Sequence, residues 1–161
     1  MRVCQNLSAS FDDPNLVSCA GLVPVMGLAE RAGLHDLAAT HVRVPGSAGS
    51  NPAVKVAALV AGMVAGADTI DAMDLLRHGG MGRVLTAGRA PSTLGTFLRA
   101  FTFGHVRQLD AVACRVLVNL AARAPLLVGA DQVAYLDIDD TIKATFGHKK
   151  WLFAVRGEPA W

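Results

Sequence analysis

The stretch from His105 to Ala122, HVRQLDAVACRVLVNLAA, carries the strongest structural signal in the chain. Its apolar side chains recur every three or four residues, a spacing that places them on one side of an α-helix. Gly104 precedes the segment and Pro125 follows it. The pattern therefore predicts an amphipathic helix between these two residues. Its apolar positions are Val106, Leu109, Ala113, Val116, Leu117 and Leu120.

The composition of the whole chain agrees with a mainly helical protein. Its 161 residues are 52% hydrophobic and 17% charged, which suffices for a packed core and excludes a disordered or low-complexity chain. Aromatic residues make up 6%, so alanine, valine and leucine dominate the apolar content, as they do in close-packed helices. At about 150 residues per domain, the length alone suggests one globular unit.

Prolines and glycines divide the first half of the chain. A helix is expected from Pro24 to near Gly33, and residues 45–51 (PGSAGSN) form the clearest loop. Asn51 as N-cap and Pro52 in the first turn then begin a helix that continues to about Val64. Glycines in this helix would allow a neighbouring helix to pack closely.

Two further helices are expected before His105. Asp68 or Thr69 can cap an amphipathic segment that stops at Gly79–Gly80. After a short connection over residues 81–90, Pro91 begins another helix that continues to Phe101. The region before residue 130 is therefore predicted to be helical throughout.

The sequence shows no membrane span or secretory signal. The longest charge-free apolar run that reads as one helix, Val56–Ala67, has twelve residues, whereas a membrane helix needs about 20. Polar residues follow Arg2, and residues 1–20 show little periodicity beyond a short strand at Leu16–Cys19. Three cysteines without CxxC spacing suit a reducing compartment. We expect a cytoplasmic protein with no membrane partner.

The net charge of +2 conceals an uneven distribution. Seven arginines and a single acid, Asp110, give residues 77–123 a net charge of +6, so the rest of the chain carries −4. A basic stretch of this kind is typical of contact with a phosphate backbone. The alternative is that these arginines merely solvate helix surfaces. They are Arg77, Arg83, Arg89, Arg99, Arg107, Arg115 and Arg123.

Residues 68–103 read as a helix, a glycine turn and a second helix with the sequence PSTLGTFLRAF. A helix-turn-helix motif places the N-terminal residues of its second helix in the major groove of DNA, where hydroxyls and guanidinium groups make contacts. An ordinary helical hairpin is the alternative. The candidate DNA-contacting residues are Arg89, Ser92, Thr93, Thr96, Arg99 and Arg107.

A second candidate site follows an apolar strand at 133–136, where the sequence YLDIDDT begins at Tyr135. Strand alternation places Asp137 and Asp139 on one face and Asp140 on the other. Two carboxylates on one face suit Mg²⁺. A solvated acidic strand end is the alternative.

Three stretches together carry a family resemblance: ADTIDAMDLLRHGGMGR, RAPSTLGTFLRAFTFGHVRQLDAV and YLDIDDTIKATFG. They resemble successive blocks of bacterial insertion-sequence transposases with a DDE domain of the group 1 type, over about residues 6–147. The resemblance implies a mainly α chain, with a helical DNA-binding region (1–130) before the first β-strand of an RNase H-like catalytic domain (131–147). It implies that Asp139, with Asp137 as fallback, is the first catalytic and metal-binding carboxylate, that Mg²⁺ is the cofactor, and that transposon ends are the DNA partner.

The sequence departs from the transposases at His148. Where they continue with a glycine-rich, lysine-containing strand turn, this chain has HKKWLFAVRGEPAW, so residues 148–161 are consistent with a frameshifted or truncated end. The second Asp and the Glu of the triad have no positions, and two-metal phosphoryl transfer needs carboxylates from several strands. We therefore expect a fragment without strand-transfer activity. Its unpaired strand edge would favour self-association, so a homo-oligomer is among the expected partners.

Two alternatives remain from the sequence. The first is a non-catalytic DNA-binding module that competes with a full-length transposase. The second is a haloacid-dehalogenase-like phosphatase, because DIDDT fits the D-x-D-x-T pattern, with Asp137 as nucleophile and Asp139 as acid/base. That fold needs a later threonine or serine, a lysine and an acid pair, yet twenty residues follow Thr141. The phosphatase therefore ranks below the transposase.

Overall fold

The computed structural model describes residues 13–86, 88–124, 129 and 132. The chain divides into two units, Met1–Leu127 and Val128–Trp161, and the fold is given for the described residues of the first. Its helices are α1 (Leu22–Arg31), α2 (Leu34–His41), α3 (Pro52–Val64), α4 (Met81–Val84), α5 (Pro91–Arg99) and α6 (Phe103–Ala121), with 3₁₀ helices η1 (Ser47–Gly49) and η2 (Asp71–Arg77).

The prediction of a mainly helical region is confirmed, and residues 13–86 and 88–124 contain no strand. The short strand expected at Leu16–Cys19 is wrong. Leu16 and Val17 have no regular structure, and a turn that leads into α1 begins at Ser18. Leu16 N–H bonds back to Asp13 O, and its carbonyl accepts a single bond from Gly80 N–H at 2.8 Å. The strand and acidic motif expected at 133–141 lie outside the described residues.

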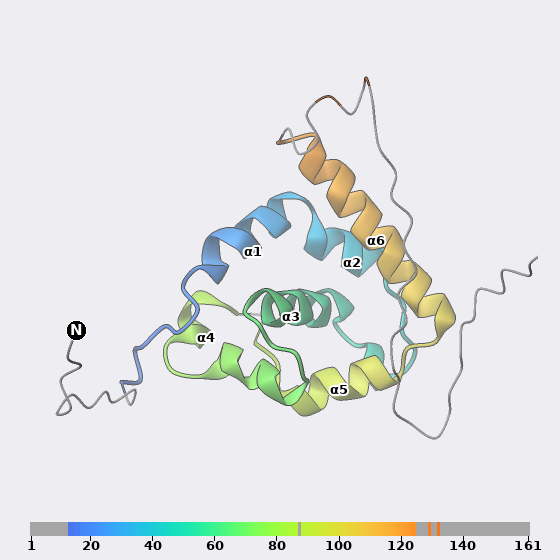
Figure 1. Ribbon diagram of the computed structural model, residues 1–161. Helices are drawn as coiled ribbons and strands as arrows, with labels where there is room; N and C mark the ends of the chain where they lie inside the picture. The colour runs from blue at the N-terminus through green and yellow to red at the C-terminus, as the bar shows by residue number, and fades with distance from the viewer. Residues whose placement is uncertain (1–12, 87, 125–128, 130–131, 133–161) are drawn as a thin grey trace, which may run out of the picture. The chain divides into compact units, whose positions relative to one another are not determined.

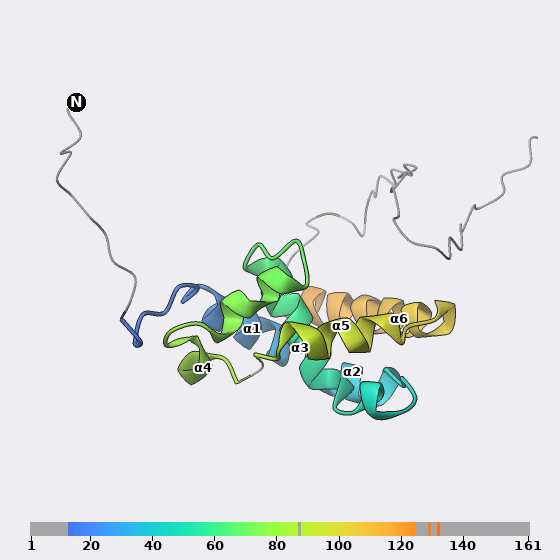
Figure 2. The same ribbon diagram turned by 90° about the horizontal axis from the view of Figure 1, so that it is seen from below.

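Helix α3 lies at the centre of this unit. In Figure 1, α1 and α2 run along one side of α3, and η2 and α5 run along the other. In the view from below, α5 crosses in front of α3 (Figure 2). Helix α6 packs on α2. A central helix of this kind must be apolar on nearly all sides, and the sequence PAVKVAALVAGMV meets that requirement at all but one position.

Two hydrophobic clusters share α3 and α5. In the first, Leu94 of α5 lies among apolar side chains of α3, η2 and α4, and in the second, Phe97 of α5 packs with residues of α2, α3 and α6. Helix α3 supplies Ala58 and Ala61 to the first cluster and Ala53 and Val56 to the second. Burial of these side chains is therefore the main favourable contribution to the fold.

Glycine allows η2 to approach α3 closely. A Cβ atom at Gly62 would lie 2.2 Å from the sulfur of Met73, which is itself buried in the first cluster. The sequence-based expectation that glycines in this helix permit close packing is confirmed at Gly62.

Two of the three predicted proline starts are confirmed; the third helix, α1, begins at Leu22 and ends at Arg31, so Pro24 lies in its first turn rather than at its first residue. Helix α3 begins at Pro52 and ends at Val64 as expected, and α5 begins at Pro91, although it ends at Arg99 rather than Phe101. Helix α6 begins at Phe103, two residues before the predicted start. The reason is local, because Thr102 N–H donates to Nδ1 of His105 at 2.9 Å and thereby closes the first turn.

Three local predictions differ from the structure. Asn51 stands at the N-cap of α3 but makes no side-chain capping bond, because its backbone is left-handed with φ at 49°. Thr69 Oγ1 accepts a bond from Ala72 N–H at 3.2 Å, but the N-cap position is Ile70, and the segment is a 3₁₀ helix rather than an α-helix. Helix α2 was not expected. It begins after Gly33, whose φ of 86° reverses the chain immediately after α1.

The Gly79–Gly80 stop is confirmed, and the structure gives it a second role. Gly79 adopts a positive φ of 54°, and a Cβ there would lie 2.4 Å from the carbonyl oxygen of Leu16. Both glycines therefore leave room for the segment that precedes α1. The connection after them contains α4.

None of the helices in the described part of the chain combines the length and the apolarity needed to cross a bilayer.

Replacing a buried leucine of α5 should destabilise the fold, whereas replacing an exposed one should not. Leu94→Ala removes a fully buried side chain and is expected to lower the free energy of unfolding by about 2–5 kcal/mol. The matched control Leu98→Ala, at an exposed position of the same helix, should change it by less than about 1 kcal/mol. Urea unfolding followed by circular dichroism measures both. Equal losses would contradict the burial of Leu94.

Candidate nucleic-acid interface

Four of the six candidate DNA-contacting residues line one recess. Arg89, Ser92, Thr93 and Thr96 come from α5 and the segment before it, and the recess has a volume of about 460 Å³. We call it the α3–α5 recess. Its remaining lining residues are Ser47, Ala48, Ser50, Asn51 and Lys55.

Helices α3 and α5 both begin at this recess. Asn51 is the N-cap residue of α3, and Ser92 and Thr93 belong to the first turn of α5. Each helix starts with a proline, and neither has a side-chain capping bond. The first N–H groups of a helix lack intrahelical partners, and the helix dipole adds partial positive charge there. The recess thus receives the positive ends of two helices.

Lys55 is a buried cation in the wall of the recess. Its side chain is on α3, and the residue is 5% exposed. Nζ donates to the carbonyl oxygen of Ala48 at 2.7 Å, reaches Ser50 Oγ at 3.5 Å, and lies 5.3 Å from the centre of the Phe97 ring. Sequence reasoning missed Lys55. The signal was present, because it is the one charged residue in the apolar segment 52–64.

No carboxylate balances this positive charge. The two segments that build the recess contain no Asp or Glu from residue 37 to residue 67 and from residue 75 to residue 109. Among the described residues, no carboxylate lies within ion-pair distance of Lys55 or Arg89. The recess is therefore electropositive and rich in hydrogen-bond donors.

The hydroxyl groups differ in how far they are engaged. Thr96 Oγ1 donates to the carbonyl oxygen of Ser92 at 2.9 Å and accepts a bond from Arg99 Nη2 at 3.3 Å. The exposed hydroxyls of Ser92 and Thr93 make no hydrogen bond to any other residue that the structure describes. Arg99 does not line the recess but is linked to it through Thr96.

Arg107 lies apart from the other candidates. It belongs to α6, where its guanidinium carbon lies 5.9 Å from the centre of the Phe103 ring. Five of the six candidates thus lie on α5 or just before it, and the sixth does not join them.

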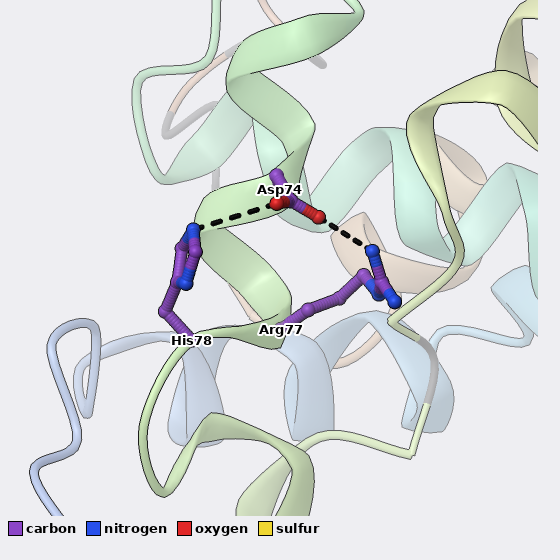
Figure 3. Close-up of polar contacts among 3 residues, drawn as sticks. All are labelled: Asp74, Arg77 and His78. Atoms are coloured by element: carbon purple, nitrogen blue, oxygen red, sulfur yellow. Dashed lines mark hydrogen bonds and ion pairs between the residues drawn. The ribbon is translucent and has the colours of Figure 1, made fainter. Parts of the chain in front are cut away.

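Other arginines of the basic stretch are engaged locally. Asp74 lies between Arg77 and His78 (Figure 3), with Oδ1 2.6 Å from Arg77 Nη1 and Oδ2 3.5 Å from His78 Nε2. Arg83 donates to the side-chain oxygen of Asn15. The +6 counted along residues 77–123 therefore overstates the positive charge presented to a ligand, because Asp74 falls just outside that count.

The helix-turn-helix expectation needs correction. That motif joins its two helices by a turn of about three or four residues. Here η2 ends at Arg77 and α5 begins at Pro91, with α4 between them. The candidate DNA-contacting surface therefore does not follow from that motif. It is defined instead by the residues that line the α3–α5 recess.

A second recess, of about 550 Å³, borders the first at Arg89. Its lining combines the carboxylate residue Glu30 with His35 and the shared Arg89, beside apolar side chains such as Val23 and Met26. The carboxylate makes it a poorer site for an anion than a recess without one. The α3–α5 recess is the better candidate for contact with phosphate.

The predicted catalytic residues lie outside the described part of the chain. This holds for Asp139, for its fallback Asp137, and for the tail at 148–161. No three His, Cys, Asp or Glu side chains in the described ranges are close enough together to hold a metal ion. The Mg²⁺ site, the transposase carboxylate and the phosphatase interpretation of DIDDT stay predictions, and no catalytic step is derived.

Comparison of the chain with family models, with curated proteins and with solved structures finds no match.

The loop that forms one wall of the recess should depend on Gly49. A Cβ atom there would lie 1.6 Å from the carbonyl oxygen of Val44, which is backbone and cannot swing away. Gly49→Ala is expected to lower the free energy of unfolding by about 1–3 kcal/mol. Gly82→Ala, whose Cβ meets nothing within 4 Å, is the control and should have little effect. Thermal unfolding measures the stability of both variants. An unfolding temperature of Gly49→Ala equal to that of Gly82→Ala would contradict the close approach of Gly49 to Val44.

Proposed function

We propose that this chain binds DNA and that α5, together with the α3–α5 recess, contacts the phosphate backbone. The observation that carries the proposal is the grouping of Arg89, Ser92, Thr93 and Thr96 around one electropositive recess. The 45–51 loop and α3 also line this recess, which the sequence spacing of these four residues could not have predicted.

The chemistry of the surface supports a backbone contact. Arginine, serine and threonine side chains and helix N-termini are the groups that proteins commonly direct at phosphate oxygens. Such contacts position a protein on DNA without reading its sequence. Arg99, which bonds to Thr96, extends the basic surface along α5 beyond the recess. The proposal therefore includes Arg99 as a flanking contact.

The resemblance to insertion-sequence transposases supports a narrower proposal, in which the DNA is a transposon end. In complete relatives, that DNA would be cut and joined by metal-dependent hydrolysis and strand transfer. The catalytic part of this proposal depends on residues 131–147, whereas binding depends on the described helices. A non-catalytic DNA-binding module is therefore the form of the function that the described residues support best.

Binding should depend on salt and on Arg89. The affinity for a fluorescent DNA duplex, measured by anisotropy, is expected to fall steeply with salt because bound counterions are released from the phosphates. Arg89→Ala should weaken binding and reduce the slope of log affinity against log salt by about one. The control Arg31→Ala removes an exposed arginine of α1 that lines neither recess, and should bind as wild type does. Equal loss in both variants would point to net charge alone and count against the recess.

If transposon ends are the target, the protein must bind some DNA sequences more tightly than others. In competition assays at fixed salt, duplexes taken from the DNA that flanks the coding sequence should displace the probe better than duplexes with the same bases in shuffled order. A specific site is typically bound about 10³-fold or more tightly than non-specific DNA. Equal competition would remove transposon ends as the target while leaving backbone binding intact.

A further inference from the structure

We infer that the α3–α5 recess is a preformed site for a single phosphate group, in which Lys55 supplies the charge and the starts of α3 and α5 supply hydrogen-bond donors. The inference rests on the proposed function where it assigns this phosphate to the DNA backbone. The recess itself carries the rest of the argument.

The first step concerns the cost of burying Lys55. Moving an ammonium group out of water without an opposite charge is strongly unfavourable, and hydrogen bonds to neutral groups offset that cost only in part. The carbonyl of Ala48 at 2.7 Å and the face of Phe97 give such partial compensation. The missing opposite charge is available only from outside the described residues, and the recess is where it can enter.

The second step concerns the unused donors. An ammonium group has three N–H donors, of which one bonds strongly to Ala48 and another is 3.5 Å from Ser50 Oγ. From α5 and the segment before it, the hydroxyls of Ser92 and Thr93 and the guanidinium of Arg89 have no acceptor among the described residues. The lining therefore supplies donors from both helices and contains no charged acceptor.

The third step identifies the ligand chemistry. A ligand that satisfies donors from several directions and carries negative charge is a tetrahedral oxyanion, of which phosphate is the common biological example. A cation would be repelled, and a neutral ligand would leave the charge of Lys55 uncompensated. The phosphate can belong to DNA or to a small phosphorylated molecule, because both present the same group.

The central variant is Ser92→Asp. It places a carboxylate in the first turn of α5, where the helix dipole favours negative charge, within the recess that Lys55 also lines. The variant should therefore unfold at a higher temperature than wild type and should also block the site. Loss of binding in a stabilised protein cannot be ascribed to misfolding. Ser18→Asp adds the same charge at an exposed residue outside the recess and is the control.

The assay is a titration with inorganic phosphate, followed by the backbone amide resonances of positions 92 and 93, with each variant's DNA affinity measured in parallel. In wild type and in Ser18→Asp, phosphate should shift both resonances saturably and raise the unfolding temperature. In Ser92→Asp the phosphate response should disappear and the affinity for DNA should fall about tenfold or more. Lys55→Met keeps the apolar stem of the side chain and should also abolish the phosphate response.

The outcomes separate this inference from the proposed function. Absence of a saturable phosphate response in wild type, or an unchanged response in Ser92→Asp, would overturn the phosphate site even if DNA still bound. A phosphate response without DNA binding would support the site, assign it to a small phosphorylated ligand, and overturn the proposed function. Loss of both phosphate and DNA binding in Ser92→Asp supports both.

Discussion

The burial of α3 on nearly all sides is the constraint on which the rest of this structure depends. Its alanines and valines enter both hydrophobic clusters, and Gly62 lets η2 approach to within contact of its backbone. Along α3 only Met63 and Val64, in its last turn, are exposed, so a charged residue earlier in the helix is surrounded by apolar side chains. Lys55 is that residue, and its ammonium group can leave the apolar interior only toward the recess that α5 and the 45–51 loop enclose.

The position of the positive charge follows from this packing more than from the number of arginines. Arg77 is paired with Asp74, and Arg83 is bonded to Asn15, so both are engaged within the fold. The recess instead combines one arginine with a lysine that lies outside the basic stretch and with two uncapped helix ends. The linear count of charge and the geometry of the recess both point to α5, but the count could not register partners across the fold.

The sequence predicted the elements that depend on local rules. Proline fixed the starts of α3 and α5, and apolar periodicity located α6, because those signals act over one or two helical turns. Prediction from the sequence failed where tertiary contacts determine the local structure. Helix α2 has too short an apolar pattern to stand out, and Asn51 adopts a left-handed backbone that withdraws its side chain from capping. Four residues of the proposed site, on α5 and in the segment before it, were named from their hydroxyl and arginine groups, whereas Lys55 was missed because its role in the proposal depends on its burial and on a loop that precedes it in the chain.

Lys55 could be regarded as a purely structural residue that pins the 45–51 loop to α3. Its bond to Ala48 O does hold that loop, and Gly49 lets the loop turn tightly against Val44. A neutral donor could make the same single bond, however, without the cost of desolvating a full charge. The charge is useful only where an anion arrives to meet it. Residues 37–67 and 75–109, which build the recess, contain no carboxylate, whereas an acid among the lining residues would lie near Lys55 and Arg89 and would oppose the entry of an anion.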